Sequence, residues 1–412
     1  MTDEAIRVIL FGVDCGEYDM DKSMDELEAL AQANGMEVVA QITQKRDKPE
    51  GATCIGEGKL YEGKLTAHNL YAECAIFDCE LTGSQIRNLE QALEIPVIDR
   101  TMLILEIFAG RAVTNEGKLQ TELAELQYRL PRLAGLGESL SRQGGGGAGG
   151  GGARRGAGES KLEYDRRHIR HRVTFLKEKL AETEKRRAET RRAREKSGDP
   201  VIALVGYTNV GKSSLLNALC GAEVQEADML FATLDPTARK LTLPSGLPSI
   251  AVDTVGFVSR LPHSLVEAFK STLEEAAFAD VIVRVCDASD PESARQLDIT
   301  DAVLTELGCD NIPKLTVYNK CDKTNAMPFM PDAICTSAKT GKGLDELLEK
   351  LDKALSERVR RVKVLLPYDK LSLAAPMRTR GTVLTEEYRD DGVYLEGIIK
   401  AIDVHVFEGY YI

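Results

Sequence analysis

Residues 1–99 alternate short apolar runs with stretches whose apolar positions recur at helical spacing. The runs IRVILFGV, MEVVAQIT, ECAIFDC and IPVIDR predict strands. DELEALAQANG, which ends on a glycine, predicts a helix, and further helices are expected near 58–69 and 83–94. Strands that alternate with helices favour a small, mostly parallel α/β domain over residues 1–99.

Two long helices are predicted within residues 100–197. The first carries leucines at alternating steps: Leu119, Leu123, Leu126, Leu130 and Leu133. The second carries a similar rhythm, interrupted by Arg166: Leu162, Ile169, Val173, Leu176 and Leu180. Such spacing aligns one apolar seam per helix, and two seams bury each other in an antiparallel coiled-coil hairpin. Two helices packed flat on separate domains are the alternative.

The stretch SRQGGGGAGGGGARRGAG, residues 141–158, separates these two helices. Glycine loses the most backbone entropy on ordering, so such a run resists a single conformation. In a hairpin the run forms the tip, and we expect it to be the part presented to a partner. A passive tether between domains is the alternative.

The rest of the chain predicts two further domains. Residues 198–356 run from a strand through a glycine-rich loop to a helix and then continue to alternate, which is typical of an α/β domain. Residues 357–412 contain a strand, a helix and then the strands TVLTEEYRD and GVYLEGIIKAI. This last segment is expected to form a small α+β domain.

The motif GYTNVGKS at residues 206–213 follows the apolar strand VIALV and precedes the helix SLLNALC. This is G-x4-G-K-S in the strand–loop–helix context that a phosphate-binding P-loop requires. Gly206 and Gly211 let backbone N–H groups surround a phosphate, and Lys212 reaches the β- and γ-phosphates. Ser213 supplies a hydroxyl ligand to Mg²⁺, and the helix N-terminus adds favourable dipole charge.

Three downstream motifs restrict the nucleotide to a guanine nucleotide. AVDTVGF ends a strand with Asp253, whose carboxylate can hold a metal-bound water, and Gly256, whose N–H can contact a γ-phosphate. LTVYNKCD places a carboxylate, Asp322, where it can accept from guanine N1 and the exocyclic amine. CTSAK supplies a backbone amide for guanine O6. Order and spacing agree with a GTPase of the translation-factor superclass, which binds GTP and GDP.

We therefore predict an α/β protein whose P-loop GTPase domain has a mixed, mostly parallel sheet. It is preceded by the small α/β domain with its coiled-coil hairpin and followed by the small α+β domain. The expected nucleotide-binding residues are Gly206, Tyr207, Thr208, Asn209, Val210, Gly211, Lys212, Ser213, Ser214, Phe231, Ala232, Thr233, Asp253, Thr254, Val255, Gly256, Asn319, Lys320, Asp322, Ser337, Ala338 and Lys339.

The stretch LFATLDPT is expected to supply the switch I threonine. Similar GTPases keep a threonine just after Phe-Ala or Phe-Thr, which selects Thr233, with Thr237 as the alternative. Its hydroxyl would join Ser213 on Mg²⁺ and its carbonyl would orient the attacking water, while Asp253 holds the ion through a water. The expected catalytic residues are Lys212, Thr233 and Gly256.

The residue after Gly256 is Phe257, where many hydrolysing GTPases carry a glutamine that positions water. We expect slow intrinsic hydrolysis that a partner stimulates; the alternative is that the Thr233 backbone or another polar group suffices unaided. Asn209 resembles the asparagine with which some GTPases hold K⁺ against the phosphates. An asparagine that only hydrogen-bonds the loop is equally compatible, so K⁺ stays an open cofactor beside Mg²⁺.

Charge is distributed unevenly along the chain. The net charge is −12, yet residues 161–197 contain fourteen Lys or Arg against seven Asp or Glu. A cationic segment on an otherwise acidic protein suggests a polyanionic partner. The expected RNA contacts are Arg142, Arg154, Arg155, Arg166, Arg167 and Arg170. A solvated helix face paired internally with Glu182, Glu184 and Glu189 is the alternative.

The nine cysteines are scattered and form no CxxC pair. Several lie in apolar runs, where a thiol packs as a small hydrophobic group, so we expect no thiolate metal site and a reducing, cytoplasmic location. The N-terminus carries no signal-peptide pattern, and no apolar stretch is long enough to span a bilayer. We expect no membrane insertion; peripheral membrane association is left open.

The whole chain resembles the HflX family of ribosome-associated GTPases. The resemblance rests on YTNVGKSSLLNAL, DMLFATLDPTARK, DTVGFVSRLPHSLVEAFKSTLEEA and YNKCD, and on IGEGKLYE, GKLQTELAELQYRLPRL and ESKLEYDRRHIRHRV outside the GTPase domain. The family ends its glycine-rich segment in Arg-Gly-Pro-Gly-Glu, whereas this chain has Ala157 in place of the proline and a longer glycine run. Loss of a fixed φ makes this loop freer than the family's.

The resemblance implies binding to the large ribosomal subunit and its rRNA, and GTP-dependent splitting of stalled or idle ribosomes. We expect a monomer. A GTP-gated rRNA-binding switch in subunit assembly, without splitting activity, is the alternative function. A membrane-remodelling GTPase with a coiled-coil stalk is a third, which the absence of a lipidation motif at the C-terminal GYYI disfavours.

Overall fold

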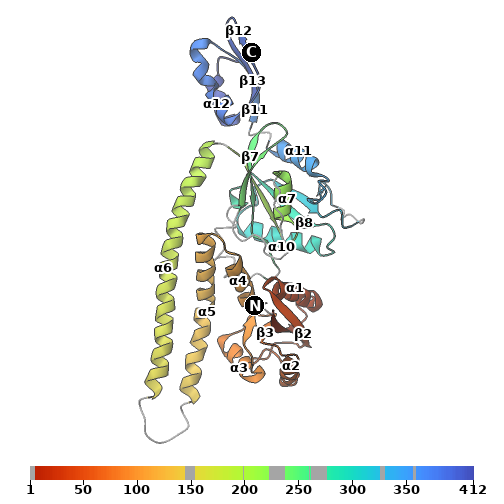
Figure 1. Cartoon of the computed structure of the whole chain (residues 1–412), viewed down its shortest axis with the longest axis vertical. Helices are drawn as coiled ribbons and strands as arrows, with labels where there is room; N and C mark the ends of the chain where they lie inside the picture. The colour runs from red at the N-terminus through yellow and green to blue at the C-terminus, as the bar shows by residue number, and fades with distance from the viewer. Residues whose placement is uncertain are drawn as a thin grey trace. The chain divides into compact units, whose positions relative to one another are not determined.

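The computed structural model divides into two compact units, which are described separately below. The first reaches as far as Thr183, and the second holds most of the chain from Glu184 onward (Figure 1). The described residues are 5–143, 154–197, 199–221, 237–258, 260, 276–324, 330–355 and 359–412.

The first unit begins with a four-stranded, fully parallel sheet of order β2-β1-β3-β4. Its strands are β1 (Ile6–Asp14), β2 (Met36–Lys45), β3 (Cys74–Phe77) and β4 (Val97–Asp99). Four helices accompany them: α1 (Met20–Ala33), α2 (Glu57–Asn69), α3 (Gly83–Leu93) and α4 (Arg100–Arg111). The alternation read from the sequence is thus present in this part of the molecule.

The core of this sheet forms because apolar strand residues meet the apolar faces of the helices. Phe11 and Phe77 stack on neighbouring strands with ring centroids 4.8 Å apart. Leu27 and Leu30 of α1 are fully buried. Helix starts are set by caps: Thr82 and Gln85 form a capping box at α3.

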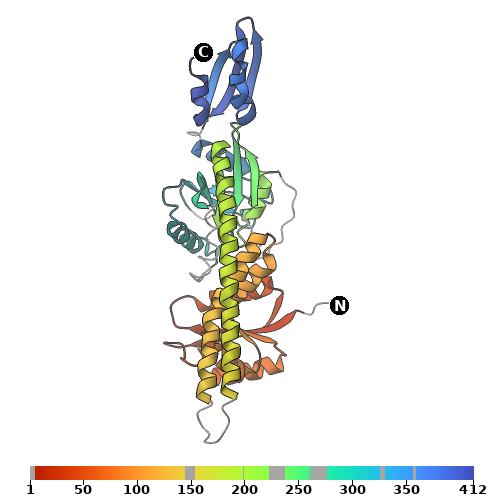
Figure 2. The ribbon, with the colours of Figure 1, turned by 90° about the vertical axis from the view of Figure 1, so that its left-hand side faces the viewer.

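Helices α5 (Asn115–Gln143) and α6 (Arg154–Ser197) follow the sheet. Figures 1 and 2 show α5 alongside the first part of α6, where Arg172 donates two hydrogen bonds, of 2.6 and 2.7 Å, to the carboxylate of Glu122. Leu123 and Leu176 of the two predicted seams are buried. Most of the glycine run, 144–153, and the side chain of Leu162 lie outside the described residues.

The second unit contains a six-stranded sheet of order β10-β9-β8-β5-β7-β6, in which only β6 is antiparallel to its neighbour. Its strands are β5 (Val201–Gly206), β6 (Thr237–Thr242), β7 (Pro248–Asp253), β8 (Val281–Asp287), β9 (Lys314–Asn319) and β10 (Ile334–Cys335). The described helices are α7 (Lys212–Leu219), α10 (Ser293–Glu306) and α11 (Leu344–Ala354).

The C-terminal part of the second unit is a three-stranded antiparallel sheet of order β11-β13-β12. Its strands are β11 (Val359–Leu366), β12 (Thr382–Arg389) and β13 (Gly392–Lys400). The helical segments η2 (Tyr368–Ala374), α12 (Ala375–Arg380) and η3 (Ala401–Phe407) complete it. Its core is a separate cluster that includes Val364, Leu395 and Phe407.

The predicted fold class is confirmed: an α/β protein with a mixed, mostly parallel sheet, an N-terminal α/β domain and a C-terminal sheet domain. Across the described residues, no helix combines the length and the apolar character needed to cross a membrane.

Candidate nucleotide-binding site

The P-loop joins β5 to α7, and its backbone conformation depends on two glycines. Gly206 has a φ of 153°, and a Cβ there would lie 2.2 Å from the carbonyl oxygen of Val285. Gly211 caps α7 with a φ of 85°, and a Cβ there would lie 2.5 Å from Nδ2 of Asn319. Both positions therefore exclude side chains, which leaves backbone N–H groups free to line the loop at the positive end of α7.

Lys212 is the first residue of α7 and is 6% exposed. Its Nζ donates to the carbonyl oxygens of Gly206 and Tyr207 at 3.2 and 3.0 Å. The ammonium group is thus held over the loop that it belongs to, where P-loop NTPases place the β- and γ-phosphates.

Ser213 and Asp253 are brought together from α7 and the end of β7. The Ser213 hydroxyl and the Asp253 carboxylate are hydrogen-bonded, and Asp253 is 1% exposed. A hydroxyl beside a buried carboxylate is an oxygen-only donor set, which suits Mg²⁺. These residues fit the ion: Ser213 would be a direct ligand, and Asp253 would act through a water.

The segment after Asp253 lies against the P-loop. A Cβ on Gly256 would lie 2.8 Å from Cγ2 of Thr208 and 3.0 Å from Nζ of Lys212, so only glycine fits this close to the ammonium group. Phe257 is 3% exposed, and its backbone exchanges hydrogen bonds with Gly206 (3.1 Å) and Thr208 (2.8 Å). Phe257 is therefore part of the packed support of the P-loop.

The guanine motifs meet because β9 and β10 are neighbouring parallel strands. Asn319, 1% exposed, donates to the carbonyl oxygen of Val210 at 3.0 Å and accepts from the backbone N–H of Ala338 at 3.1 Å. One buried amide thus connects the P-loop to both guanine loops. Asp322 is exposed and accepts from the hydroxyl of Ser337 at 2.6 Å, which lowers the pKa of its carboxyl group.

Lys320 crosses from the guanine motif to the P-loop. Its Nζ lies 2.5 Å from the carbonyl oxygen of Asn209 and 2.9 Å from Oδ2 of Asp287. Burial alone would raise the pKa of Asp287, but hydrogen bonds from Ser289 and Lys320 outweigh it, and the pKa is lowered. Asp287 therefore stays ionised and holds Lys320 in place.

Sequence reasoning missed Asp287, although its position at the carboxyl end of the strand VIVRVCD was a usable signal. It also missed Thr336, which is fully buried and donates to Asn319 Oδ1 at 3.4 Å. Among the predicted residues, Phe231, Ala232 and Thr233 lie outside the described residues. The other predicted nucleotide-binding positions lie on the P-loop, after β7, after β9 and after β10, at the carboxyl end of the sheet.

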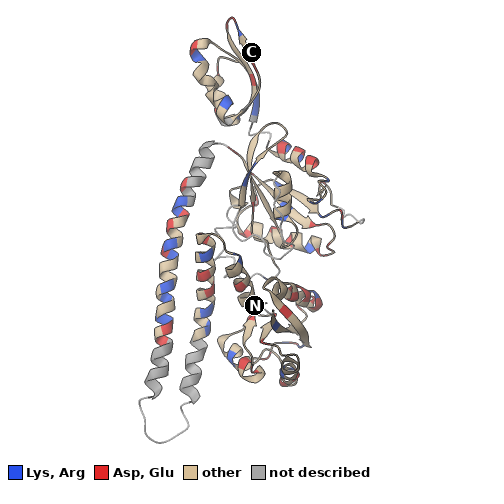
Figure 3. Ribbon diagram, in the orientation of Figure 1, with Lys and Arg blue, Asp and Glu red and all other residues tan. Residues whose placement is uncertain are grey.

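The predicted RNA-contacting arginines lie on α5 and α6. Arg167 and Arg170 are exposed, and Arg166 is partly exposed, with a long 3.9 Å ion pair to Glu163. Figure 3 shows basic and acidic residues interspersed along α6, and Glu182 pairs with Lys179 at 3.0 Å. The side chains of Arg142, Arg154 and Arg155 lie outside the described part of the structure.

A P-loop, a magnesium-type donor pair and a guanine motif on one mixed sheet define a P-loop GTPase. Four family profiles match the chain in order: GTP-binding GTPase N-terminal (21–109), GTP-binding GTPase Middle Region (111–194), 50S ribosome-binding GTPase (201–320) and HflX C-terminal domain (324–401). The chain belongs to the HflX family of GTPases.

Curated relatives agree with this assignment. The GTPase HflX of Caldanaerobacter subterraneus is 48% identical over 94% of this chain and 89% of its own length. The GTPase HflX of Escherichia coli is 38% identical over 91% of this chain and 89% of its own length. Among solved structures, a GTP-binding protein from Sulfolobus solfataricus in complex with GDP is 24% identical, with a TM-score of 0.45, covering 85% of this chain and 99% of that one.

Proposed function

We propose that this protein binds the large ribosomal subunit and uses its GTP-bound state to split idle or stalled ribosomes. The observation that carries the proposal is the match of residues 201–320 to the family described as 50S ribosome-binding GTPase. That segment holds the P-loop, Asp253 and Asn319, so the ribosome-binding family and the nucleotide site coincide. The nucleotide would set which form of the protein engages the subunit.

Hydrolysis is proposed to be slow until the ribosome stimulates it. The side chain of Phe257 carries no hydrogen-bonding group, and the residue is buried beside the P-loop. No side chain at this position can therefore orient the attacking water. A partner that orders switch I, or contributes a group, supplies the missing function.

The chain's own residues divide the remaining work. Lys212 neutralises charge that develops on the phosphates, and the N–H of Gly256, placed beside Lys212, donates to the γ-phosphate. Ser213 and Asp253 would hold Mg²⁺, which offsets charge between the β- and γ-phosphates. Thr233 is proposed to complete the ion's ligands and to orient water through its carbonyl.

Ribosomal RNA is the proposed target of the arginines on α6 and beside the glycine run. Arg167 and Arg170 are exposed on the first part of α6, and Arg166 is held only by a long ion pair. Arg142, Arg154 and Arg155 flank the glycine run in the sequence. Guanidinium groups that neutralise phosphates release counterions, so binding should weaken steeply as salt rises.

Sedimentation with ribosomes tests the proposal directly. The full chain is added to intact ribosomes with GTP, with GDP and with a non-hydrolysable GTP analogue, and the gradient is read for free subunits. Release of subunits with GTP and the analogue, but not with GDP, is the expected result. Binding to the large subunit without release would favour the assembly switch. In a parallel assay with liposomes in place of ribosomes, pelleting of the protein with the lipid would favour a membrane role.

Turnover of the purified chain tests the partner requirement and the ion. We expect a low GTPase rate that rises when large subunits are added; rapid turnover without large subunits would contradict this.

Asn209 is exposed in the P-loop with a φ of 60°, and we propose that its side chain helps to hold K⁺. Equal rates in K⁺ and Na⁺ at one ionic strength would exclude that role. A monomeric mass by light scattering is expected.

A further inference from the structure

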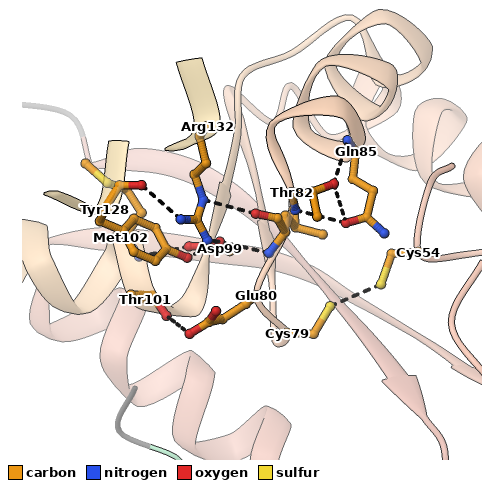
Figure 4. Close-up of polar contacts among 11 residues, drawn as sticks. Cys54, Cys79, Glu80, Thr82, Gln85, Asp99, Thr101, Met102, Tyr128 and Arg132 are labelled. Carbon is orange, nitrogen blue, oxygen red and sulfur yellow. Dashed lines mark hydrogen bonds and ion pairs between the residues drawn. The ribbon is translucent and has the colours of Figure 1, made fainter. Parts of the chain in front are cut away.

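Two cysteines of the first unit face each other across the sheet's carboxyl end. The Sγ atoms of Cys54 and Cys79 lie 3.1 Å apart, although the residues are 25 positions apart in the sequence (Figure 4). Cys54 belongs to the connection between β2 and α2 and is 2% exposed, whereas Cys79 follows β3 and is partly exposed. Neither residue takes part in the nucleotide site.

The backbone around Cys54 is arranged to aim its side chain. Cys54 has a φ of 65°, a left-handed conformation that is uncommon for a residue with a Cβ. It is held there because Cys54 and Glu50 exchange two backbone hydrogen bonds of 2.9 Å. In addition, Asn88 Nδ2 of α3 donates to the carbonyl oxygen of Ala52 at 3.0 Å. Such a conformation persists only where its surroundings over-determine it.

Cys79 is fixed equally well on the opposite side. The residue before it, Asp78, is 2% exposed and accepts from Arg100 at 3.0 Å and from the hydroxyl of Ser23 at 2.7 Å. Two residues after it, the N–H of Leu81 donates to Asp99 at 3.0 Å. Backbone and side-chain hydrogen bonds thus position both thiols, and those beside Cys79 are buried.

We propose that Cys54 and Cys79 are a redox modification site that closes reversibly to a disulfide. The two sulfurs need to approach by only about 1 Å to reach a bond of about 2.05 Å. A metal ion is the other use of paired thiols, but nowhere in the described ranges are three His, Cys, Asp or Glu side chains grouped to hold one.

The chemistry needs one two-electron oxidant, for which we name a peroxide. The hydrogen bond between the two thiols lowers the pKa of Cys54 and, together with burial, raises that of Cys79, so Cys54 ionises first. Its thiolate attacks one peroxide oxygen; an S–O bond forms, the O–O bond breaks, and the leaving oxygen departs as water. Cys79 then attacks that sulfur, forming S–S and releasing the second oxygen as water with the Cys79 proton.

The disulfide would close next to the contacts that attach α5 to the sheet domain. Leu81 accepts a hydrogen bond of 3.0 Å from Nε of Arg132 on α5, and Asp99 accepts one of 2.5 Å from the hydroxyl of Tyr128 (Figure 4). Only one residue, Glu80, separates Cys79 from Leu81. Oxidation therefore stabilises the segment on which the hairpin is anchored, because a closed loop has fewer unfolded conformations.

The test treats the full chain with hydrogen peroxide and counts thiols after denaturation. We expect the nine free thiols to fall to seven, with a mass loss of about 2 Da, and dithiothreitol to restore nine. Peptide mapping should join the peptides that contain Cys54 and Cys79. The melting temperature of the first unit should be roughly 5–10 °C higher after oxidation, and amide hydrogen exchange around residues 79–83 should slow.

Variants separate this site from general thiol oxidation. Cys54→Ser and Cys79→Ser should each abolish the loss of thiols, whereas Cys74→Ser, at a partly buried thiol whose pKa desolvation raises to about 12, should leave it unchanged. Three outcomes would each overturn the proposal: a count of nine free thiols after peroxide treatment, oxidation to sulfinic acid without a cross-link, or a disulfide from either residue to Cys15. The peptide map of the unmodified sequence decides even where a variant fails to fold.

Discussion

The carboxyl ends of the parallel strands carry different polar groups in the two α/β sheets. In the second unit, this edge carries the glycine-lined P-loop, Lys212 and Asp253, which are buried, and Asp322, which is exposed. In the first unit, Asp78, directly after β3, and Asp99, at the end of β4, are turned inward. Asp78 and Asp99 are 2% and 1% exposed, and both accept hydrogen bonds from other side chains of the same unit.

The difference shows that topology places loops at one edge but does not decide their use. Both sheets gather loop residues where parallel strands end, the usual location of ligand sites in such folds. In the GTPase sheet, glycines keep side chains out so that phosphates can approach. In the N-terminal sheet, the same edge is filled by an ion-paired network that attaches α4 and α5. Removing groups from the first edge should cost function, and from the second edge stability.

Lys212→Ala should have the largest effect and should test the functional side of this contrast. It removes the charge beside Gly256, and we expect the rate of GTP hydrolysis to fall by about 10²–10³-fold, as for loss of one transition-state donor. The measurement is phosphate release with ribosomes present. Lys353→Ala, at an exposed lysine of α11, is the matched control and should change the rate far less.

Asp322→Asn should change nucleotide choice rather than remove activity. The carboxylate is positioned by Ser337 at 2.6 Å and is expected to accept two hydrogens from guanine. An amide offers a donor in place of one acceptor, so affinity for GDP should fall by roughly 10²-fold, as for a lost charge-assisted bond and an unpaired donor. Affinity for the xanthine nucleotide should rise, since its extra carbonyl accepts. Unchanged GDP affinity by calorimetry would contradict this assignment.

Sequence patterns predicted one edge far better than the other, for a physical reason. The P-loop is encoded locally, because Gly206 and Gly211 fix its backbone and Lys212 follows directly. The contacts of Asp99 with Tyr128, and of Cys54 with Cys79, join residues 29 and 25 positions apart. They depend on loop conformations that periodicity does not encode, such as the left-handed backbone at Cys54. The sequence pattern therefore contains no sign that Cys54 and Cys79 lie side by side.

Tyr128→Phe should weaken the inward-facing network and leave nucleotide binding intact. Tyr128 is 6% exposed, its hydroxyl donates to the buried Asp99, and burial raises its pKa. Loss of a hydrogen bond to a charged group should cost about 2 kcal/mol and lower the melting temperature by roughly 4–8 °C. Tyr61→Phe, at a tyrosine that is 64% exposed, is the control and should change nothing measurable. A loss of GDP affinity in Tyr128→Phe would break the comparison.

Glu106→Gln should have the smallest effect and the opposite sign. Burial raises the pKa of Glu106 despite a hydrogen bond of 3.1 Å from Asn34, with Glu125 raising it further and Arg129 lowering it. At a pH between the pKa of Glu106 in the unfolded chain and its raised pKa in the folded chain, the folded chain binds more protons than the unfolded one. The free energy of unfolding therefore falls as pH rises through that window. An amide keeps an oxygen for Asn34 without the charge. The variant should therefore be more stable at pH 7, by less than about 1 kcal/mol, and the gain should vanish towards pH 4 in urea titrations.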